Sequence, residues 1–187
     1  MCAGLGAPDR AALKHGESCA IFGCGGLGQY AVQLARWRGA LVHAVDIDPD
    51  KRALAMRHGA TSTGVPQGDG PGQGADVVIN FAPTARVWPA MVHAVRPLGR
   101  IVAAAMVDEP VPLKQDWLTG SGVTLKGTSI GTRAQIRALL ALHKAEPLLA
   151  EIGRIGLQDA TMALTSRAEG RASLAEGRAR GRYCIMF

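Results

Sequence analysis

The stretch Ile21–Ala40, IFGCGGLGQYAVQLARWRGA, decides how this chain folds. A short apolar run leads into the spacing G-x-G-x-x-G, formed by Gly23, Gly25 and Gly28, and an amphipathic helical pattern follows. Gly23 allows a tight turn, Gly25 leaves room for a pyrophosphate to approach the backbone, and Gly28 allows close packing of helix and strand. Because the motif joins a predicted strand to a predicted helix, it indicates dinucleotide binding rather than an ordinary turn.

An acidic residue, Asp46, ends the next predicted strand, Leu41–Asp46. A carboxylate at this place accepts both hydroxyls of an adenosine ribose and repels a 2′-phosphate, so we expect NAD rather than NADP. The structural alternative is that Asp46 only caps the following helix. Lys51, one turn into that helix, either reaches the ribose or stays solvated, and Gly26 gives the pyrophosphate further room.

Apolar segments alternate with helical patterns along the chain, which predicts an α/β fold: a doubly wound parallel sheet with helices on both faces. Proline and glycine mark the ends of several elements. Residues 64–74 are predicted to form a glycine-rich loop and residues 107–119 an irregular segment. The predicted strands are 18–23, 41–46, 75–82, 99–107 and 122–128, and the predicted helices are 26–37, 49–59, 85–95 and 133–146.

Composition excludes several classes of protein. The net charge is +6, but the arginine-rich C-terminal part lacks interleaved aromatic residues, so we expect a solvated surface and no nucleic-acid binding. No apolar run is long enough to cross a membrane, and charges interrupt the first twenty residues, which argues against a secretory signal. The four cysteines show no paired spacing, so we expect a reduced, cytoplasmic protein without a disulfide framework or zinc knuckle.

Several segments together resemble the cofactor domain of the zinc-dependent, medium-chain alcohol dehydrogenases. Beside the glycine motif they are CAGL at the start, AVDIDPDKRALA, VRPLGRIV, GTSIGTRAQI and the closing GRARGR, in the order of that family. The resemblance implies hydride transfer between an alcohol or aldehyde and NAD in the full-length enzymes. It also implies an inter-domain helix remnant at 1–16, an NAD-binding Rossmann domain at 17–150, and a segment at 151–187 that returns to the catalytic domain.

The resemblance further implies roles for individual residues. Gly23, Gly25, Gly26, Gly28 and Arg182 would hold the pyrophosphate; Asp46 and Lys51 the adenosine ribose; Phe81 and Ala82 would flank the adenine side and the cleft edge; Leu27, Ala105 and Met106 would lie at the nicotinamide. The strand Gly122–Thr128 would pair with its twin in a homodimer.

The departures from the family decide what activity to expect. The catalytic domain that precedes this part in the family is not found, so no catalytic residue is assigned and the chain is expected to be a truncated NAD-binding portion, inactive alone. Cys2 stands where a zinc ligand lies, but one thiolate does not make a zinc site, so tight zinc binding is not expected. The five histidines show no ligand spacing to Cys2 and are expected at the surface or in strands.

Two further departures from the family concern the cofactor site. Ala105 replaces a commoner glycine, and the repeated AEGRA at 168–172 and 175–179 lengthens the segment before Arg182. The alternative is a non-catalytic NAD-binding module or a subunit of a larger assembly.

Overall fold

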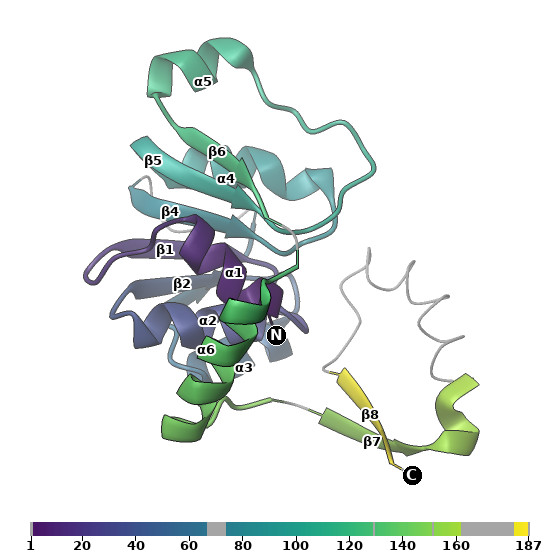
Figure 1. Ribbon diagram of the computed structural model, residues 1–187. Coiled ribbons are helices and arrows are strands. Elements are labelled where there is room, and N and C mark those ends of the chain that lie inside the picture. Colours follow the sequence, from purple (N-terminus) through teal and green to yellow (C-terminus); the bar gives the residue numbers. More distant parts are fainter. Residues whose placement is uncertain (1, 67–73, 129, 151, 162–181, 187) are drawn as a thin grey trace.

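The structure, a computed structural model, describes residues 2–66, 74–128, 130–150, 152–161 and 182–186. Helices and strands alternate along most of it (Figure 1). In chain order the elements are α1 (Cys2–Arg10), β1 (Ser18–Phe22), α2 (Gly28–Trp37), β2 (Leu41–Val45), α3 (Pro49–Arg57), β3 (Ser62–Gly64), β4 (Ala75–Asn80), the short 3-10 helix η1 (Ala85–Val87), α4 (Trp88–Ala94), β5 (Val95–Ala103), α5 (Gln115–Ser121), β6 (Thr124–Gly127), α6 (Arg133–Ala145), β7 (Ile152–Gly156), the 3-10 helix η2 (Leu157–Asp159) and β8 (Arg182–Met186).

Within the described residues, six parallel strands form one sheet in the order β3-β2-β1-β4-β5-β6. β1 lies inside it, and its last residue, Phe22, is in register with Val45 of β2 and with Asn80 of β4. The sheet is therefore wound outward in both directions from the boundary between β1 and β4. The connections that follow the two strands lead to opposite faces of the sheet at such a switch point, and open α/β sheets bind ligands there.

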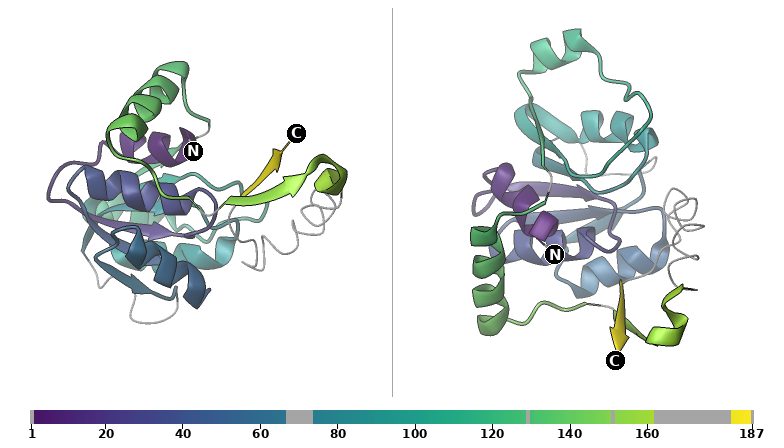
Figure 2. Two further views of the ribbon diagram at one scale, coloured as in Figure 1. Left: turned by 90° about the horizontal axis from the view of Figure 1, so that it is seen from below. Right: turned by 45° about the vertical axis from the view of Figure 1, so that its right-hand side comes forward.

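Helices cover both faces of the sheet, as Figure 2 shows. One apolar cluster joins the sheet to α1, α2 and α3, and a second joins it to η1, α4 and α5. A third, smaller cluster packs Leu139 of α6 and Leu148 against Tyr30 and Leu34 on the outer side of α2. The predicted doubly wound parallel sheet with helices on both faces is confirmed.

Some predicted boundaries are wrong. Residues 107–119 were expected to be irregular, but α5 begins at Gln115. β5 begins at Val95, ahead of the predicted start at residue 99, and the three-residue β3 and the parallel pair β7–β8 were not predicted. Both AEGRA repeats and most of the glycine-rich loop lie outside the described residues.

Charged side chains tie the strands together at their amino ends. The carboxylate of Asp76 on β4 accepts hydrogen bonds from the backbone N–H and the hydroxyl of Ser18, both at 2.8 Å, and from Nε of Arg96 at 2.7 Å. Burial by itself would raise the pKa of Asp76, but these hydrogen bonds outweigh it and lower the pKa to about 2. Arg100 of β5 donates to Glu17 at 2.6 Å in the same region. These bonds hold three neighbouring strands in register at the edge opposite the switch point.

Helix α1 ends in a Schellman motif. The N–H of Leu13 donates to the carbonyl of Pro8 at 3.1 Å, and the N–H of Ala12 donates to the carbonyl of Asp9 at 2.9 Å. The motif needs a left-handed residue, and Ala12 fills that place with a φ of 49°. Glycine is the usual residue there, because a side chain crowds the following carbonyl.

Candidate functional site

The glycine turn leaves β1 at the switch point. Gly23 has a φ of +87°, and a Cβ at this position would lie 2.7 Å from the backbone nitrogen of Ala82. A Cβ on Gly28 would overlap the carbonyl oxygen of Gly23. A Cβ on Gly25 would meet no heavy atom within 4 Å. Two of the three glycines are thus required by the fold itself, whereas Gly25 borders open space.

Helix α2 begins directly after this turn and points its N-terminus at the carboxyl edge of the sheet. It runs from Gly28 to Trp37, with Leu27 as its N-cap. Leu27 offers no side-chain acceptor to the first turn of the helix. Helix N-termini carry a partial positive charge and outward-facing N–H groups, which together attract an anion.

The carboxylate of Asp46 lies against the glycine turn. One oxygen, Oδ2, accepts the backbone N–H of Cys24 at 2.7 Å, and the other, Oδ1, accepts the N–H of Asp48 at 2.9 Å. Each carboxylate oxygen has a further lone pair with which to accept a hydroxyl. The capping alternative for Asp46 is wrong, because Asp48 is the N-cap of α3 and accepts the N–H of Asp50.

Lys51 lies close to Asp48, the N-cap of α3. Its side chain is buried, and its Nζ is 3.9 Å from Oδ2 of Asp48. A buried lysine side chain therefore lies beside the N-cap residue of α3. Arg52 turns instead to the backbone and donates to the carbonyls of Asp46 and Ile47 at 2.8 and 3.0 Å.

The loops that follow β4 and β5 meet at Asn80, a residue that was not predicted to matter. Its Oδ1 accepts the N–H of Ala82 at 2.8 Å, and its backbone carbonyl accepts the N–H groups of Ala104 and Ala105 at 2.9 and 3.0 Å. The loop after β4 is also tied to β1, because Phe81 donates to the carbonyl of Phe22 at 2.7 Å. The predicted residues Phe81, Ala82 and Ala105 are therefore brought to the same edge as the glycine turn.

Three other predicted positions lie further from this network. Met106 follows Ala105 and is 89% exposed, so its side chain contacts little of the described chain. Arg182 begins β8, and its side chain lies outside the described residues. The predicted dimer strand, 122–128, contains β6, which is the last strand at one edge of the sheet. Its outer side has no strand partner among the residues described.

The histidines and cysteines do not assemble into a metal site. Among the residues described, no three His, Cys, Asp or Glu side chains gather in a way that could hold a metal ion. Cys19 and Cys24 are free and buried, and burial raises the pKa of Cys19 to about 12. His58 is buried at the end of α3, so its predicted place at the surface or in a strand is wrong.

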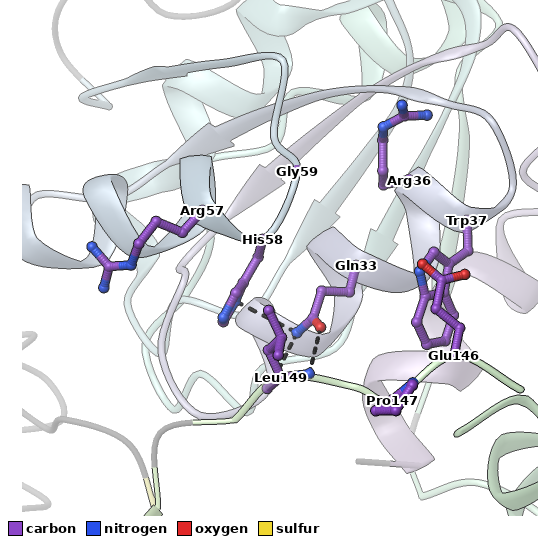
Figure 3. Close-up of a pocket in the computed structure, with 9 residues that line it drawn as sticks. All are labelled: Gln33, Arg36, Trp37, Arg57, His58, Gly59, Glu146, Pro147 and Leu149. Carbon is purple, nitrogen blue, oxygen red and sulfur yellow. Dashed lines mark hydrogen bonds between the residues drawn. The ribbon is translucent and has the colours of Figure 1, made fainter. Parts of the chain in front are cut away.

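A separate hollow of about 480 Å³ lies near the last turn of α2, at the end of that helix opposite the glycine turn (Figure 3). Gln33 closes one side of it: its Nε2 donates to the carbonyl of Leu149 at 2.9 Å, and its Oε1 accepts the N–H of Leu149 at 2.8 Å. The side chains of Arg36 and Arg57 extend in different directions in Figure 3, so they do not converge on one ligand. We interpret the hollow as the place where the segment after α6 is attached to α2.

None of the helices in the described part of the chain is long and apolar enough to cross a membrane.

Comparison with known proteins agrees with this geometry. The sequence profile of the family described as zinc-binding dehydrogenase matches residues 26–145. An alcohol dehydrogenase of Moraxella sp. (strain TAE123) is 30% identical over 146 residues, which are 74% of this chain and 43% of that protein. Cinnamyl alcohol dehydrogenase 7 of Oryza sativa subsp. japonica is 26% identical over 179 residues, which are 91% of this chain and 47% of that protein.

Solved structures show the same fold. An NAD-dependent alcohol dehydrogenase is similar with a TM-score of 0.81 at 22% identity, covering 100% of this chain and 55% of that one. Acetophenone reductase from Geotrichum candidum NBRC 4597, in complex with NAD, is similar with a TM-score of 0.81 at 21% identity, covering 91% of this chain and 50% of that one. The chain spans about half the length of the relatives that it matches. Since the family profile covers most of the chain, the chain belongs to the zinc-binding dehydrogenase family.

Proposed function

We propose that this chain is the NAD-binding part of an alcohol-dehydrogenase-like oxidoreductase, and that the dinucleotide lies along the carboxyl edge of β2, β1, β4 and β5. One observation carries the proposal. The hydrogen bond between Cys24 N and Asp46 Oδ2, at 2.7 Å, joins the glycine turn and the acidic residue into a single unit. A phosphate-binding turn and a ribose-binding carboxylate are the two parts that an adenosine diphosphate needs.

The pyrophosphate would lie over the glycine turn formed by Gly23, Gly25, Gly26 and Gly28. The open space beside Gly25 allows its oxygens to approach the backbone, and the N-terminus of α2 offsets their negative charge. Arg182 is proposed as a second pyrophosphate ligand, in line with the resemblance of the closing segment.

The adenosine ribose would lie at the end of β2. Its hydroxyls would donate to the remaining lone pairs of Asp46, and Lys51 would contribute a positive charge nearby. The carboxylate of Asp46 would repel a 2′-phosphate, which favours NAD over NADP. Two of the similar solved proteins are named as NAD-dependent or as a complex with NAD, which supports this choice.

The nicotinamide would lie toward β5, beside Leu27, Ala105 and Met106, with Phe81 and Ala82 at the edge of the cleft. When bound, the nicotinamide carries the hydride that the family exchanges with an alcohol or aldehyde. The residues of this chain would bind and orient the cofactor. We propose that the isolated chain binds NAD(H) without oxidising alcohols, since it spans only half of its relatives. Alcohol-dependent formation of NADH by the isolated chain, with or without added zinc, would contradict this part.

Titration with NADH and NADPH tests the cofactor assignment, with Asp46→Ala as the variant and Asp48→Ala as its matched control. Hydrogen bonds to a charged group contribute about 1.5–3 kcal/mol, so Asp46→Ala should weaken NADH binding by about 10-fold to 100-fold and reduce the preference over NADPH. Asp48→Ala removes the cap of α3 but not the ribose ligand, so it should lower stability and keep the preference. Equal binding of NADH and NADPH by the unsubstituted chain would refute the assignment.

The oligomeric state is tested separately. We propose a homodimer in which β6 pairs with its twin, because β6 is the last strand at one edge of the sheet. Sedimentation velocity over a range of concentrations should show a dimer. Leu125→Lys is a better variant for testing the interface than Val123→Lys, because Leu125 is exposed whereas Val123 is buried. A chain that sediments as a monomer at high concentration contradicts the homodimer.

A further inference from the structure

Asn80 occupies the switch point of the sheet. It is the last residue of β4 and is in register with Phe22, the residue directly before the glycine turn. Its Oδ1 accepts the N–H of Ala82, and that same nitrogen would lie 2.7 Å from a Cβ on Gly23. Ala82 is therefore held between the side chain of Asn80 and the backbone of the glycine turn.

The backbone of Ala82 limits the space around Gly23 on one side of the glycine turn. Gly23 is fixed from the other side by its own N–H, which donates to the carbonyl of Val45 at 2.8 Å. If Ala82 moves, the space beside Gly23 changes. The backbone carbonyl of Asn80 also holds the loop after β5 through Ala104 and Ala105.

Hydrogen bonds compensate the burial of the Asn80 amide only in part. Asn80 is completely buried, and in the described part of the chain its Nδ2 has no hydrogen-bond partner. A buried donor without an acceptor is unfavourable, which offsets part of what the amide contributes to stability. The Oδ1 bond to Ala82 is the favourable contact that the amide makes here, and it acts at the cofactor edge.

We propose that Asn80 is a positioning residue, which sets the glycine turn for the pyrophosphate through Ala82 and does not itself contact the cofactor. The proposal rests on the proposed NAD-binding function. In this role Asn80 is a determinant of NADH affinity in addition to the G-x-G-x-x-G motif and Asp46.

The test compares three variants by NADH titration and by amide hydrogen exchange of the cofactor-free chain. Asn80→Ala removes the acceptor and should weaken NADH binding by about tenfold, the effect expected for one hydrogen bond, with faster exchange at Ala82 and in the glycine turn. Asn80→Ser keeps a neutral side-chain oxygen that can accept the same N–H, and it should restore affinity to within about threefold and slow exchange again.

Thr84→Ala is the matched control. Its Oγ1 accepts the N–H of Arg86 at 3.3 Å, a similar side-chain bond in the same loop that does not reach Gly23. This variant should leave NADH affinity unchanged. If the unsubstituted chain binds NADH and Asn80→Ala binds it equally well, or if Thr84→Ala weakens binding as much, the positioning role is overturned and the proposed function stands. If the unsubstituted chain does not bind NADH, both fall.

Discussion

Gly25 gives the sharpest test of how the turn works, because the fold does not need it. Its φ lies outside the left-handed region, and a Cβ would meet no heavy atom within 4 Å. Gly25→Ala should therefore leave the free energy of unfolding almost unchanged. The added methyl group would stand where the pyrophosphate approaches the backbone, and the phosphate would be displaced from the N-terminus of α2.

The size of the effect follows from the contacts that are lost. Displacement of the pyrophosphate weakens about two charge-assisted hydrogen bonds, so we expect a loss of about 3 kcal/mol, which is an increase of more than 100-fold in the Kd for NADH. Fluorescence titration with NADH measures the Kd, and urea unfolding measures stability.

Gly28→Ala is the contrasting variant, because its Cβ would overlap the carbonyl of Gly23. Overpacking at that place should lower stability by about 1–3 kcal/mol. A Gly25→Ala chain that binds NADH as tightly as the unsubstituted chain would refute the placement of the pyrophosphate. A Gly25→Ala chain that loses as much stability as Gly28→Ala would show that the space beside Gly25 is not free.

Three further predictions concern stability, each measured by urea unfolding. Ala12→Gly relieves a left-handed alanine and should stabilise the chain by about 0.5 kcal/mol or more, although added flexibility of the unfolded chain offsets part of the gain. The pKa of Asp76 is lowered from 3.8 to about 2, which contributes roughly 2 kcal/mol to the free energy of unfolding. This contribution is fully present above pH 3.8 and is lost as the pH falls through 2. Asp76→Asn should flatten the dependence of stability on pH, and an unchanged slope would contradict the assignment. Gln33→Leu should cost about 1–2 kcal/mol and speed amide exchange at Leu149, and unchanged exchange would show that Gln33 does not hold this segment.

The sequence predicted the elements that carry strong patterns. β1, β2 and β4 are apolar runs bounded by glycine or polar residues, and the helical period around Leu34 placed α2 correctly. β3 is three small or polar residues, Ser62–Gly64, and its strand conformation comes only from pairing with β2. β7 and β8 pair with each other across a long separation, which no local pattern encodes.

The site was predictable to the extent that it depends on backbone geometry. The spacing of the glycines and the position of Asp46 follow from the strand-turn-helix context, and the structure brings them into contact. Asn80 could not be found in this way, because a side chain that accepts a backbone N–H two residues later has many common uses. Only the parallel pairing of β1 with β4 places that bond next to Gly23.

The central place of β1 has a consequence for biosynthesis. Ser18 bonds to Asp76 across 58 positions, so one edge of β1 stays uncovered until β4 has left the ribosome. The strand reads SCAIF and carries no charge to keep it from pairing with another chain. Nascent chains that stall before β4 has left the ribosome should therefore depend on chaperones or aggregate, whereas chains that stall after β4 has emerged can close the sheet around β1.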